Sequence, residues 1–442
     1  MARSFALQCC KWRISLSSQM EGGSMFKPTT LAMILAGGRV NELGVLTFYR
    51  PKSAVPFGGF ARVIDFAMSN LMRSGIELVA ILSQYRSYSL INHIGTGAAW
   101  DMIGRNRGVS ILPPFKGAES ADWYRGSADA VYQNLDFVRY HVPEQILILS
   151  GDHVYQMDYR KLISYHQDKG ADLTAAFIEV EPKQAHRFGI GTIEFEDENG
   201  GRLVAYEEKP TAPKGNFASL TILCFKPNVL YAMLEANQKQ NSFEFGRDII
   251  PMMMQQGCKV YGYRYRGYWG YTRTVDEYWK TSMDLLGRTP KINMEEWGLR
   301  TNLEHRGIRD FQPLIVGADA VLDNSMVYNG SHVFGTVHNS IIFPGVRVEK
   351  GAVVTDSILF FNNTVESGTQ LTRVVVDVNT VIGPDCQIGG PSAQACCDGI
   401  TVIGWNNQVP AGTRIGRGCT VYPELPPEKW PAAGIPDGGV LQ

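Results

Sequence analysis

The sequence of 442 residues has no run of about 18 consecutive apolar residues, so we expect no membrane-spanning helix. It also lacks an excess of charge of either sign, because 42 basic residues oppose 43 acidic ones and leave a formal net charge of -1. Proteins that bind nucleic acids or anionic membranes concentrate positive charge, so neither is the expected main partner. The composition, 44% hydrophobic and 19% charged, is typical of a globular protein.

Cysteines arranged for disulfides or metal binding are also missing. The eight cysteines stand at positions 9, 10, 224, 258, 386, 396, 397 and 419. Neither adjacent pair has the spacing of metal ligands, and no disulfide framework is visible. We therefore expect reduced thiols in a cytoplasmic protein.

The length indicates two or three domains, because single hydrophobic cores rarely grow this large. Residues 1–24 are predicted to be an extension without a defined fold. Residues 2–20 contain three basic residues and no acidic one, which resembles a transit peptide weakly. The alternative that we favour is an overlong start, with Met25 as the natural beginning.

Residues 25–286 alternate short apolar runs with helical stretches. The expected strands are residues 31–35, 78–82 and 145–149, and the expected helices are residues 61–73 and 127–140. This order predicts a Rossmann-like α/β domain of parallel strands with helices on both faces. Ligands of such sheets bind beyond the carboxyl ends of the strands. The glycines at 37–38 and 151 should therefore lie on one edge.

Residues 314–442 follow a different rule, with β-branched residues at every sixth position. The series are Ile315, Val321, Val327, Val333; Ile342, Val348, Val354; Val376, Ile382, Ile388; and Ile403, Val409, Ile415, Val421. One inward aliphatic residue per six predicts a left-handed parallel β-helix with hexapeptide repeats. Residues 287–313 are expected to be a polar linker. Because a β-helix exposes flat faces, we also expect assembly.

Two stretches near the first strand suit phosphate chemistry. In Leu35-Ala-Gly-Gly-Arg39, glycines let backbone amides approach phosphate oxygens, and Arg39 can add a charged contact. The alternative is an ordinary turn. Lys52 lies between Pro51 and Pro56, and a rigidly placed lysine can stabilise charge on a transferring phosphoryl group. A surface lysine is the alternative.

Three further positions suit binding of an anion, a metal or a sugar. Ser127 could cap the helix that it opens, which would leave amides free for an anion. Asp152 follows a buried strand on the ligand edge, where a carboxylate can hold Mg²⁺, with His153 as a structural hydrogen-bond partner. Glu208 and Lys209 fit a sugar hydroxyl and a phosphate, or form a solvated charge pair.

Further stretches carry a family resemblance. They are Ala54-Val-Pro-Phe-Gly-Gly59, Arg62-Val-Ile-Asp-Phe66, Trp123-Tyr-Arg-Gly-Ser-Ala-Asp-Ala-Val131, Phe245-Gly-Arg-Asp-Ile-Ile-Pro251 and Glu277-Tyr-Trp279. Together with the stretches above they resemble the ADP-glucose pyrophosphorylase (glucose-1-phosphate adenylyltransferase) family of sugar nucleotidyltransferases. The resemblance covers roughly residues 29–425.

The resemblance implies a Mg²⁺-dependent attack of glucose 1-phosphate on the α-phosphorus of ATP, which releases pyrophosphate and supplies glycogen or starch synthesis. By the same resemblance, Lys52 assists the transfer and Asp152 binds the metal. The nucleotide would be held by Gly37, Gly38, Arg39 and Gln84. The glucose 1-phosphate would be held by Tyr124, Gly189, Glu208, Lys209, Ser219, Glu244, Phe245 and Trp269. A homo-oligomer, a tetramer by resemblance, is expected.

The chain departs from the family pattern at charged positions. Where the family has Gly-Gly-Arg-Gly-Thr-Arg-Leu, this chain has Gly37-Gly-Arg-Val-Asn-Glu-Leu43, so Val40 replaces a glycine and Glu42 an arginine. Such a charge reversal at about 4 Å from a polyphosphate changes the interaction by several kcal/mol. Tyr271 replaces a metal-binding aspartate, for which Asp276 is a possible substitute. Tyr49 replaces the effector-binding lysine of some members.

Two hypotheses from different classes follow. The first, which the intact substrate-facing residues favour, is an active glucose-1-phosphate adenylyltransferase. The second is a weakly active or inactive regulatory homologue that binds sugar phosphate or nucleotide and assembles with an active subunit. A third possibility keeps the catalysis and changes the sugar or the nucleotide.

Overall fold

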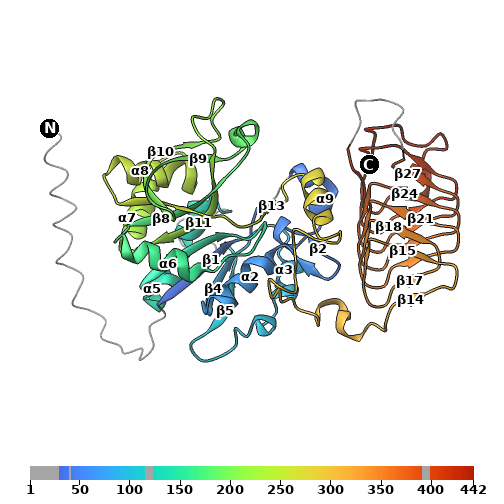
Figure 1. The fold of residues 1–442 in the computed structure, drawn as a ribbon, viewed down its shortest axis with the longest axis horizontal. Helices are drawn as coiled ribbons and strands as arrows, with labels where there is room; N and C mark the ends of the chain where they lie inside the picture. The colour runs from blue at the N-terminus through green and yellow to red at the C-terminus, as the bar shows by residue number, and fades with distance from the viewer. Residues whose placement is uncertain (1–28, 39–40, 115–122, 391–398) are drawn as a thin grey trace.

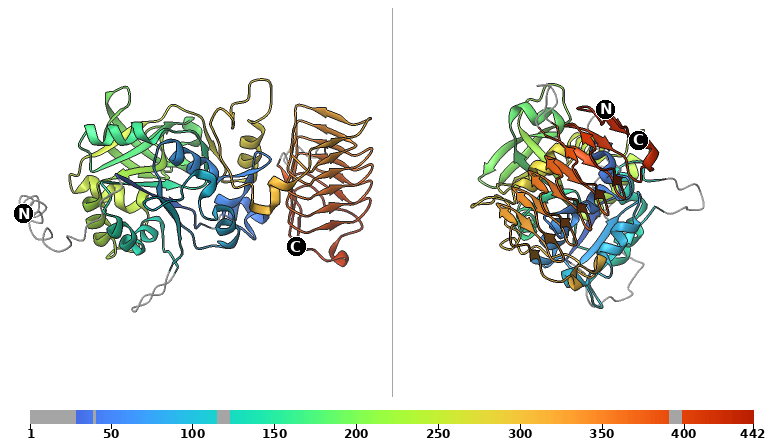
Figure 2. Two further views of the ribbon diagram at one scale, coloured as in Figure 1. Left: turned by 90° about the horizontal axis from the view of Figure 1, so that it is seen from below. Right: turned by 90° about the vertical axis from the view of Figure 1, so that its right-hand side faces the viewer.

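The computed structural model describes residues 29–38, 41–114, 123–390 and 399–442, in two parts arranged along the long axis of the molecule (Figures 1 and 2). An α/β part comes first, and a stack of short parallel strands follows it. This arrangement confirms the predicted fold class. The predicted extension, residues 1–24, and the site residue Arg39 lie outside the described ranges.

The α/β part is built on a sheet in the order β5-β4-β1-β6-β11-β8-β12-β10-β9. The strands are β1 (Thr30–Leu35), β4 (Leu78–Leu82), β5 (Gly108–Leu112), β6 (Gln145–Ser150), β8 (Leu173–Glu179), β9 (Gly189–Asp197), β10 (Gly200–Glu208), β11 (Phe217–Phe225) and β12 (Val260–Arg264). As predicted, β1 runs parallel to both β4 and β6. The sheet is mixed, however, because β11 runs antiparallel to β6 and β8.

Helices cover both faces of this sheet, because β1 has apolar side chains on both of its faces. Leu31 and Met33 face one core and Ala32 and Ile34 face the other. The first core is completed by α4 (Ser127–Gln133), α5 (Leu135–His141), α7 (Pro227–Asn237) and α8 (Ile250–Gln255). The second is completed by α2 (Ile64–Arg73), α3 (Tyr88–Ile94) and α6 (Tyr159–Asp168).

Two helix predictions differ from the structure in extent. The single helix expected at 127–140 is two helices, α4 and α5, which meet at Asn134, where the side-chain amide donates to the carbonyl of Ala130 (2.8 Å). Such side-chain bonds to the backbone compete with the helical pattern. The helix expected at 61–73 begins only at Ile64, because β3 (Ala61–Arg62) pairs with β2 (Pro56–Phe57).

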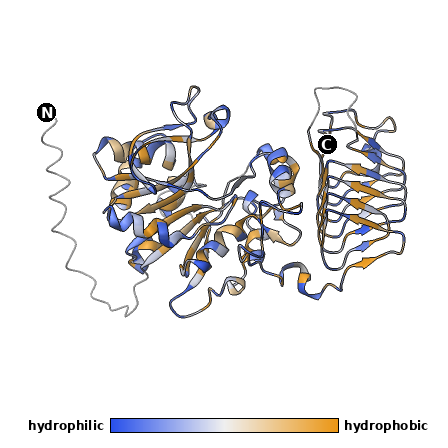
Figure 3. Cartoon of the chain, in the orientation of Figure 1, coloured by the Kyte–Doolittle hydropathy of each residue, from blue (hydrophilic) through white to orange (hydrophobic). Residues whose placement is uncertain are grey.

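The second part is the predicted β-helix, with apolar strands and polar turns (Figure 3). In the described residues its short strands, from β14 (Ile315–Val316) to β32 (Val440–Leu441), form three sheets, and all their pairings are parallel. The later members of the six-residue series are buried as predicted, including Val348, Val354 and Ile382.

The first coil corrects the predicted register by one residue. Val316, and not Ile315, aligns with the buried Val333. In the next strand, β15 (Val321–Asp323), Leu322 takes the position expected for Val321, because it aligns with buried Val337 of β18 (Thr336–His338). Ile315 and Val321 are 47% and 52% exposed. This coil ends all three described sheets, so no described strand of those sheets covers it on that side.

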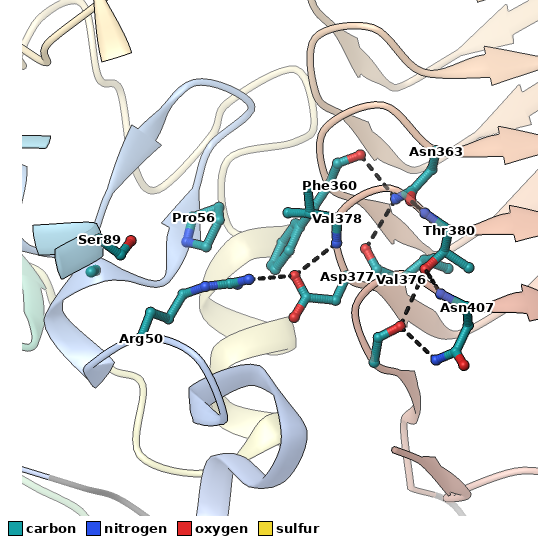
Figure 4. A network of polar contacts seen from close by, with 12 residues as sticks. Arg50, Pro56, Ser89, Phe360, Asn363, Val376, Asp377, Val378, Thr380 and Asn407 are labelled. Carbon is teal, nitrogen blue, oxygen red and sulfur yellow. Dashed lines mark hydrogen bonds and ion pairs between the residues drawn. The ribbon is translucent and has the colours of Figure 1, made fainter. Parts of the chain in front are cut away.

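The two parts share a hydrophobic core and a buried ion pair. Leu43 and Leu46 of η2 (Asn41–Thr47) and Tyr278 of α9 (Val275–Met283) join one cluster with Phe360 and Val402 of the β-helix. Figure 4 shows Arg50 reaching across this interface to Asp377. The predicted polar linker contributes two apolar side chains, Ile292 and Ile308, which are 1% and 3% exposed.

Candidate functional site

The carboxyl ends of β1 and β6 lie side by side, as the strand order predicts. The amide of Gly151 donates to the carbonyl of Leu35 at 3.0 Å. A Cβ on Gly37 would lie 3.1 Å from the backbone nitrogen of Gln84, whereas a Cβ on Gly38 would meet no described atom within 4 Å. Among the described residues, nothing therefore fills the space beside Gly38, where a phosphate could approach the backbone.

A close ion pair lies beside these glycines. Lys52, at the start of η3 (Lys52–Ala54), donates from Nζ to Oδ2 of Asp152 at 2.7 Å. The lysine side chain is only 4% exposed, while the aspartate side chain is 27% exposed. The structure thus brings together the two residues to which the sequence assigned the transfer chemistry.

Asp152 is held from several sides. Its Oδ1 accepts from the hydroxyl of Ser150, and its carbonyl accepts from the hydroxyl of Thr272 at 3.0 Å. Burial alone would raise the pKa of Asp152, but the charges of Lys52 and His153 and the hydrogen bonds from Lys52 and Ser150 together outweigh it and hold that pKa well below its usual range. Burial lowers the pKa of His153 to about 4. At neutral pH the site therefore holds a carboxylate beside a neutral imidazole.

A divalent metal fits this site only in part. Mg²⁺ is commonly bound through one or two carboxylates together with substrate phosphates. Asp152 supplies one partly exposed carboxylate, and no group of three or more His, Cys, Asp or Glu that could hold a metal occurs within the described residues. Asp152 therefore suits a cation that substrate oxygens help to hold.

The possible substitute for the aspartate that Tyr271 replaces, Asp276, does not point to the site. Tyr271 lies opposite His153, where β13 (Trp269–Tyr271) pairs with β7 (His153–Tyr155). The possible substitute, Asp276, instead accepts from the amide of Ile400 in the β-helix at 3.3 Å. Asp276 therefore bonds to the other part of the molecule rather than to the site.

Gln84 and Tyr124, both predicted to contact substrate, hold each other. The Oε1 of Gln84 accepts from the amide of Tyr124 at 2.7 Å. The Tyr124 hydroxyl donates to the carbonyl of Leu112 (3.0 Å) and accepts from Asn134 (2.9 Å). Tyr124 is 8% exposed, and both its hydroxyl and its backbone amide already bind other residues of the protein.

Glu208, Gly189 and Ser219 meet around the hydroxyl of Tyr206. That hydroxyl donates to Oε2 of Glu208 at 2.9 Å and is also hydrogen-bonded to Ser219. A Cβ on Gly189 would lie 1.9 Å from the same hydroxyl oxygen, so only glycine fits there. Three of the eight residues predicted to bind the sugar phosphate thus form one cluster, built on β9, β10 and β11.

Glu244 binds Ser127, the first residue of α4. Its carboxylate accepts from the amide of Ser127 (3.1 Å) and from the Ser127 hydroxyl. Ser127 is therefore not the helix cap, and the amide expected to attract an anion already binds Glu244. The ring of Phe245 is 2% exposed and packs near Phe225 in the core.

Trp269 lies in an aromatic group with His153, Phe188 and Tyr271, with ring centroids 5.2–5.4 Å from its own. Its indole nitrogen is buried and has no hydrogen-bond partner among the described residues. A buried donor without a partner is costly, so a bound ligand is one way to satisfy it.

A cavity beside Tyr271 contains charged residues that sequence reasoning did not assign to the site. It has a volume of about 330 Å³ and is lined by Glu42, Arg187, Lys209, Tyr271, Arg273 and Thr274. Of these, Lys209 was predicted to bind substrate, and Glu42 and Tyr271 were named as departures. Arg273 was visible as a basic residue in the same departing stretch, but its contact with Glu42, 231 positions away, was not.

The described helices include none with the length and apolar character needed to cross a membrane.

Comparison with known proteins identifies both parts of the chain. The family model for nucleotidyl transferases matches residues 31–288, and the model for a GlmU-like C-terminal hexapeptide domain matches residues 316–398. A glucose-1-phosphate adenylyltransferase of Desulforamulus reducens is 39% identical over 401 residues, which are 89% of this chain and 98% of the relative. The enzyme of the same name from Thermotoga neapolitana is 40% identical over 92% of this chain and 97% of its own length. The one from Clostridium perfringens is 40% identical over 84% of this chain and 93% of its own length. None of these relatives favours the regulatory alternative.

Proposed function

This chain belongs to the glucose-1-phosphate adenylyltransferase family, and we propose that it converts ATP and glucose 1-phosphate to ADP-glucose and pyrophosphate, the glucosyl donor for glycogen or starch synthesis. The observation that supports this activity best is the ion pair of Lys52 and Asp152 at the carboxyl ends of β1 and β6. A buried ammonium group next to an accessible carboxylate suits the transfer of a highly charged phosphoryl group.

In the proposed reaction, a phosphate oxygen of glucose 1-phosphate forms a bond to the α-phosphorus of ATP. The bond from that phosphorus to the oxygen bridging to the β-phosphorus breaks, and the electron pair leaves with pyrophosphate. No residue of the chain forms a covalent bond, so the residues act through position and charge. Lys52 would neutralise charge on the transferring group, with its approach fixed by the buried segment around it.

Mg²⁺ would be held by Asp152 together with substrate oxygens, and it would supply further neutralisation of phosphate charge. The Asp152 carboxylate has lone pairs beyond those that accept from Lys52 and Ser150, so it could hold the metal and still lie beside the Lys52 ammonium group. The nucleotide would lie along Gly37 and Gly38, with Gln84 near its base. The sugar phosphate would lie near Glu208 and Lys209.

Variants of the two central residues test this function. We expect Lys52→Gln and Asp152→Asn each to lower kcat for pyrophosphate release from ATP, glucose 1-phosphate and Mg²⁺ by about 100- to 1,000-fold, as loss of one charge-stabilising group does elsewhere. Lys350→Gln and Asp136→Asn are matched controls, because these side chains are 80% and 93% exposed. Normal turnover by Asp152→Asn would refute the proposed role of this carboxylate.

We also propose that the chain forms a homotetramer in the cytoplasm. The exposed apolar residues of the first coil, which include Val316 and Leu322, support assembly through the β-helix. The absence of disulfides at Cys224, Cys386 and Cys419 is in keeping with a reducing compartment. Light scattering at micromolar concentration should give the mass of four chains, and the mass of one chain would contradict the proposal.

A further inference from the structure

Glu42 and Arg273 form a bridge at the cavity beside Tyr271. The Nη2 and Nε atoms of Arg273 donate to the same oxygen, Oε1 of Glu42, at 2.8 and 3.0 Å. Glu42 belongs to η2, which follows the glycine turn, and Arg273 follows β13, which pairs with the strand after Asp152. The bridge thus joins the nucleotide side of the site to the side that holds Asp152.

The other charges of the cavity are positive. Arg187, Lys209 and Arg273 line it together with a single acid, Glu42, so these lining residues sum to three positive charges and one negative, although Arg187 also pairs with Glu277 outside the lining. The guanidinium of Arg187 and the ammonium of Lys52 also lie near the ring of Tyr271, at 5.6 and 5.2 Å from its centre. A cavity of this charge suits a polyanion.

The bridge is weak enough to open. The side chains of Arg273 and Glu42 are 35% and 43% exposed, and ion pairs exposed to this degree contribute about 0–1 kcal/mol. Arginine binds phosphate oxygens in a bidentate, charge-assisted manner, and a polyphosphate offers several such oxygens with more charge than one carboxylate. A phosphate chain in the cavity would therefore compete well with Glu42 for Arg273.

We propose that Arg273 binds the β- and γ-phosphates of the nucleotide, which leave as pyrophosphate, and that Glu42 holds its guanidinium in place until those phosphates displace the carboxylate. This inference rests on the proposed adenylyl transfer. It gives this chain a phosphate-binding arginine on the segment after β13, although Glu42 occupies the position of an arginine in the first loop.

Inorganic pyrophosphate is the probe that isolates this contact. Titration calorimetry with wild type and Arg273→Ala should show affinity about 10-fold or more weaker in the variant, as expected for loss of a charge-assisted hydrogen bond. Arg273→Lys should recover part of the affinity. Glu42→Gln should bind pyrophosphate more tightly than wild type, and this gain should shrink when Arg273 is already alanine.

Arg107→Ala is the matched control, because Arg107 and Glu77 form a similarly exposed pair (43% and 51%) just before β5 and β4, at the opposite ends of the strands. In the enzyme assay, Arg273→Ala should raise KM for ATP, and for pyrophosphate in the reverse reaction, more than it raises KM for glucose 1-phosphate, whose phosphate is assigned to Lys209 of the same cavity.

Three results would overturn the inference. They are unchanged pyrophosphate affinity in Arg273→Ala, a rise in KM confined to glucose 1-phosphate, or equal losses of pyrophosphate affinity in Glu42→Gln and Arg273→Ala, which would make the bridge purely structural. Arg273-dependent pyrophosphate binding by a wild-type protein that makes no ADP-glucose would support the anion site and refute the proposed function. A wild-type protein that makes ADP-glucose, together with unchanged pyrophosphate affinity in Arg273→Ala, would support the proposed function and refute the anion site.

Discussion

Arg50 of the α/β part donates to Asp377 of the β-helix at 2.7 Å, and their side chains are only 3% and 2% exposed. The guanidinium also lies 5.0 Å from the ring centre of Trp405. Arg50 precedes Lys52 by two positions, with Pro51 between them. The β-helix therefore anchors the segment that carries the proposed catalytic lysine.

Loss of Asp377 should affect both stability and catalysis. Asp377→Ala leaves a buried guanidinium without its counter-ion, which should lower the free energy of unfolding by about 3–5 kcal/mol. It should also lower kcat, because Lys52 loses its anchor. Denaturant unfolding and steady-state kinetics check the two effects. The double variant Arg50→Met/Asp377→Leu should lose less stability than the single variant, and an equal loss would contradict the ion-pair account.

Gly38 should be needed for nucleotide binding and not for folding. A Cβ at Gly38 meets nothing described within 4 Å, so Gly38→Ala should leave the melting temperature unchanged. If the nucleotide phosphates approach this backbone, the added methyl group should raise KM for ATP several-fold. Gly108→Ala, where a Cβ also meets nothing described within 4 Å, is the control at the start of β5. An unchanged KM for ATP in Gly38→Ala would argue against a phosphate at this turn.

Replacement of leucine by alanine should have different effects at two positions of the β-helix. Leu322 and Leu371 lie in the same sheet of stacked strands, but Leu322 is 38% exposed in the first coil and Leu371 is fully buried. Leu371→Ala should cost about 2–5 kcal/mol of unfolding free energy. Leu322→Ala should cost less and should instead weaken the proposed assembly, which light scattering would report.

His166 should make stability depend on pH below neutrality. It is 1% exposed, its Nδ1 lies 2.9 Å from the hydroxyl of Thr174, and burial lowers its pKa to about 4. In the unfolded chain a histidine has a pKa of about 6.5, so between these two values the unfolded state binds more protons. The free energy of unfolding should therefore fall as the pH decreases from about 6.5 to 4, by roughly 3 kcal/mol for this group.

Denaturant unfolding across this pH range should show a smaller slope for His166→Gln. The exposed His186 provides the control, and His186→Gln should keep the wild-type slope. If the free energy of unfolding falls with decreasing pH at the same slope in all three proteins, protonation of His166 does not cause the loss of stability.

The sequence was most informative where local pattern and strand order determine the structure. Apolar runs identified β1, β4 and β6, and the rule that parallel strands end at one edge placed the glycines after β1 and β6 side by side, as the structure has them. By contrast, nothing local predicts that Glu42 meets Arg273 or that Asp276 turns to Ile400. These contacts depend on how distant segments pack.

Neighbouring residues of similar chemistry caused a different kind of error. Ile315 and Val316 are both β-branched, so the six-residue pattern alone could not decide which of them faces inward. Ser127 is a favourable capping residue in isolation, but the carboxylate of Glu244, 117 positions away, takes the amide of the helix end. Propensity describes what a residue can do, and tertiary contacts decide among the options.

The most direct test of the central claim follows labelled phosphorus through the reaction. Wild-type protein is incubated with glucose 1-phosphate, Mg²⁺ and ATP labelled at either the α- or the γ-phosphorus. We expect α-label in ADP-glucose and γ-label in pyrophosphate, in equal amounts. Label that remains in ATP, or γ-label transferred to the sugar phosphate, would contradict it.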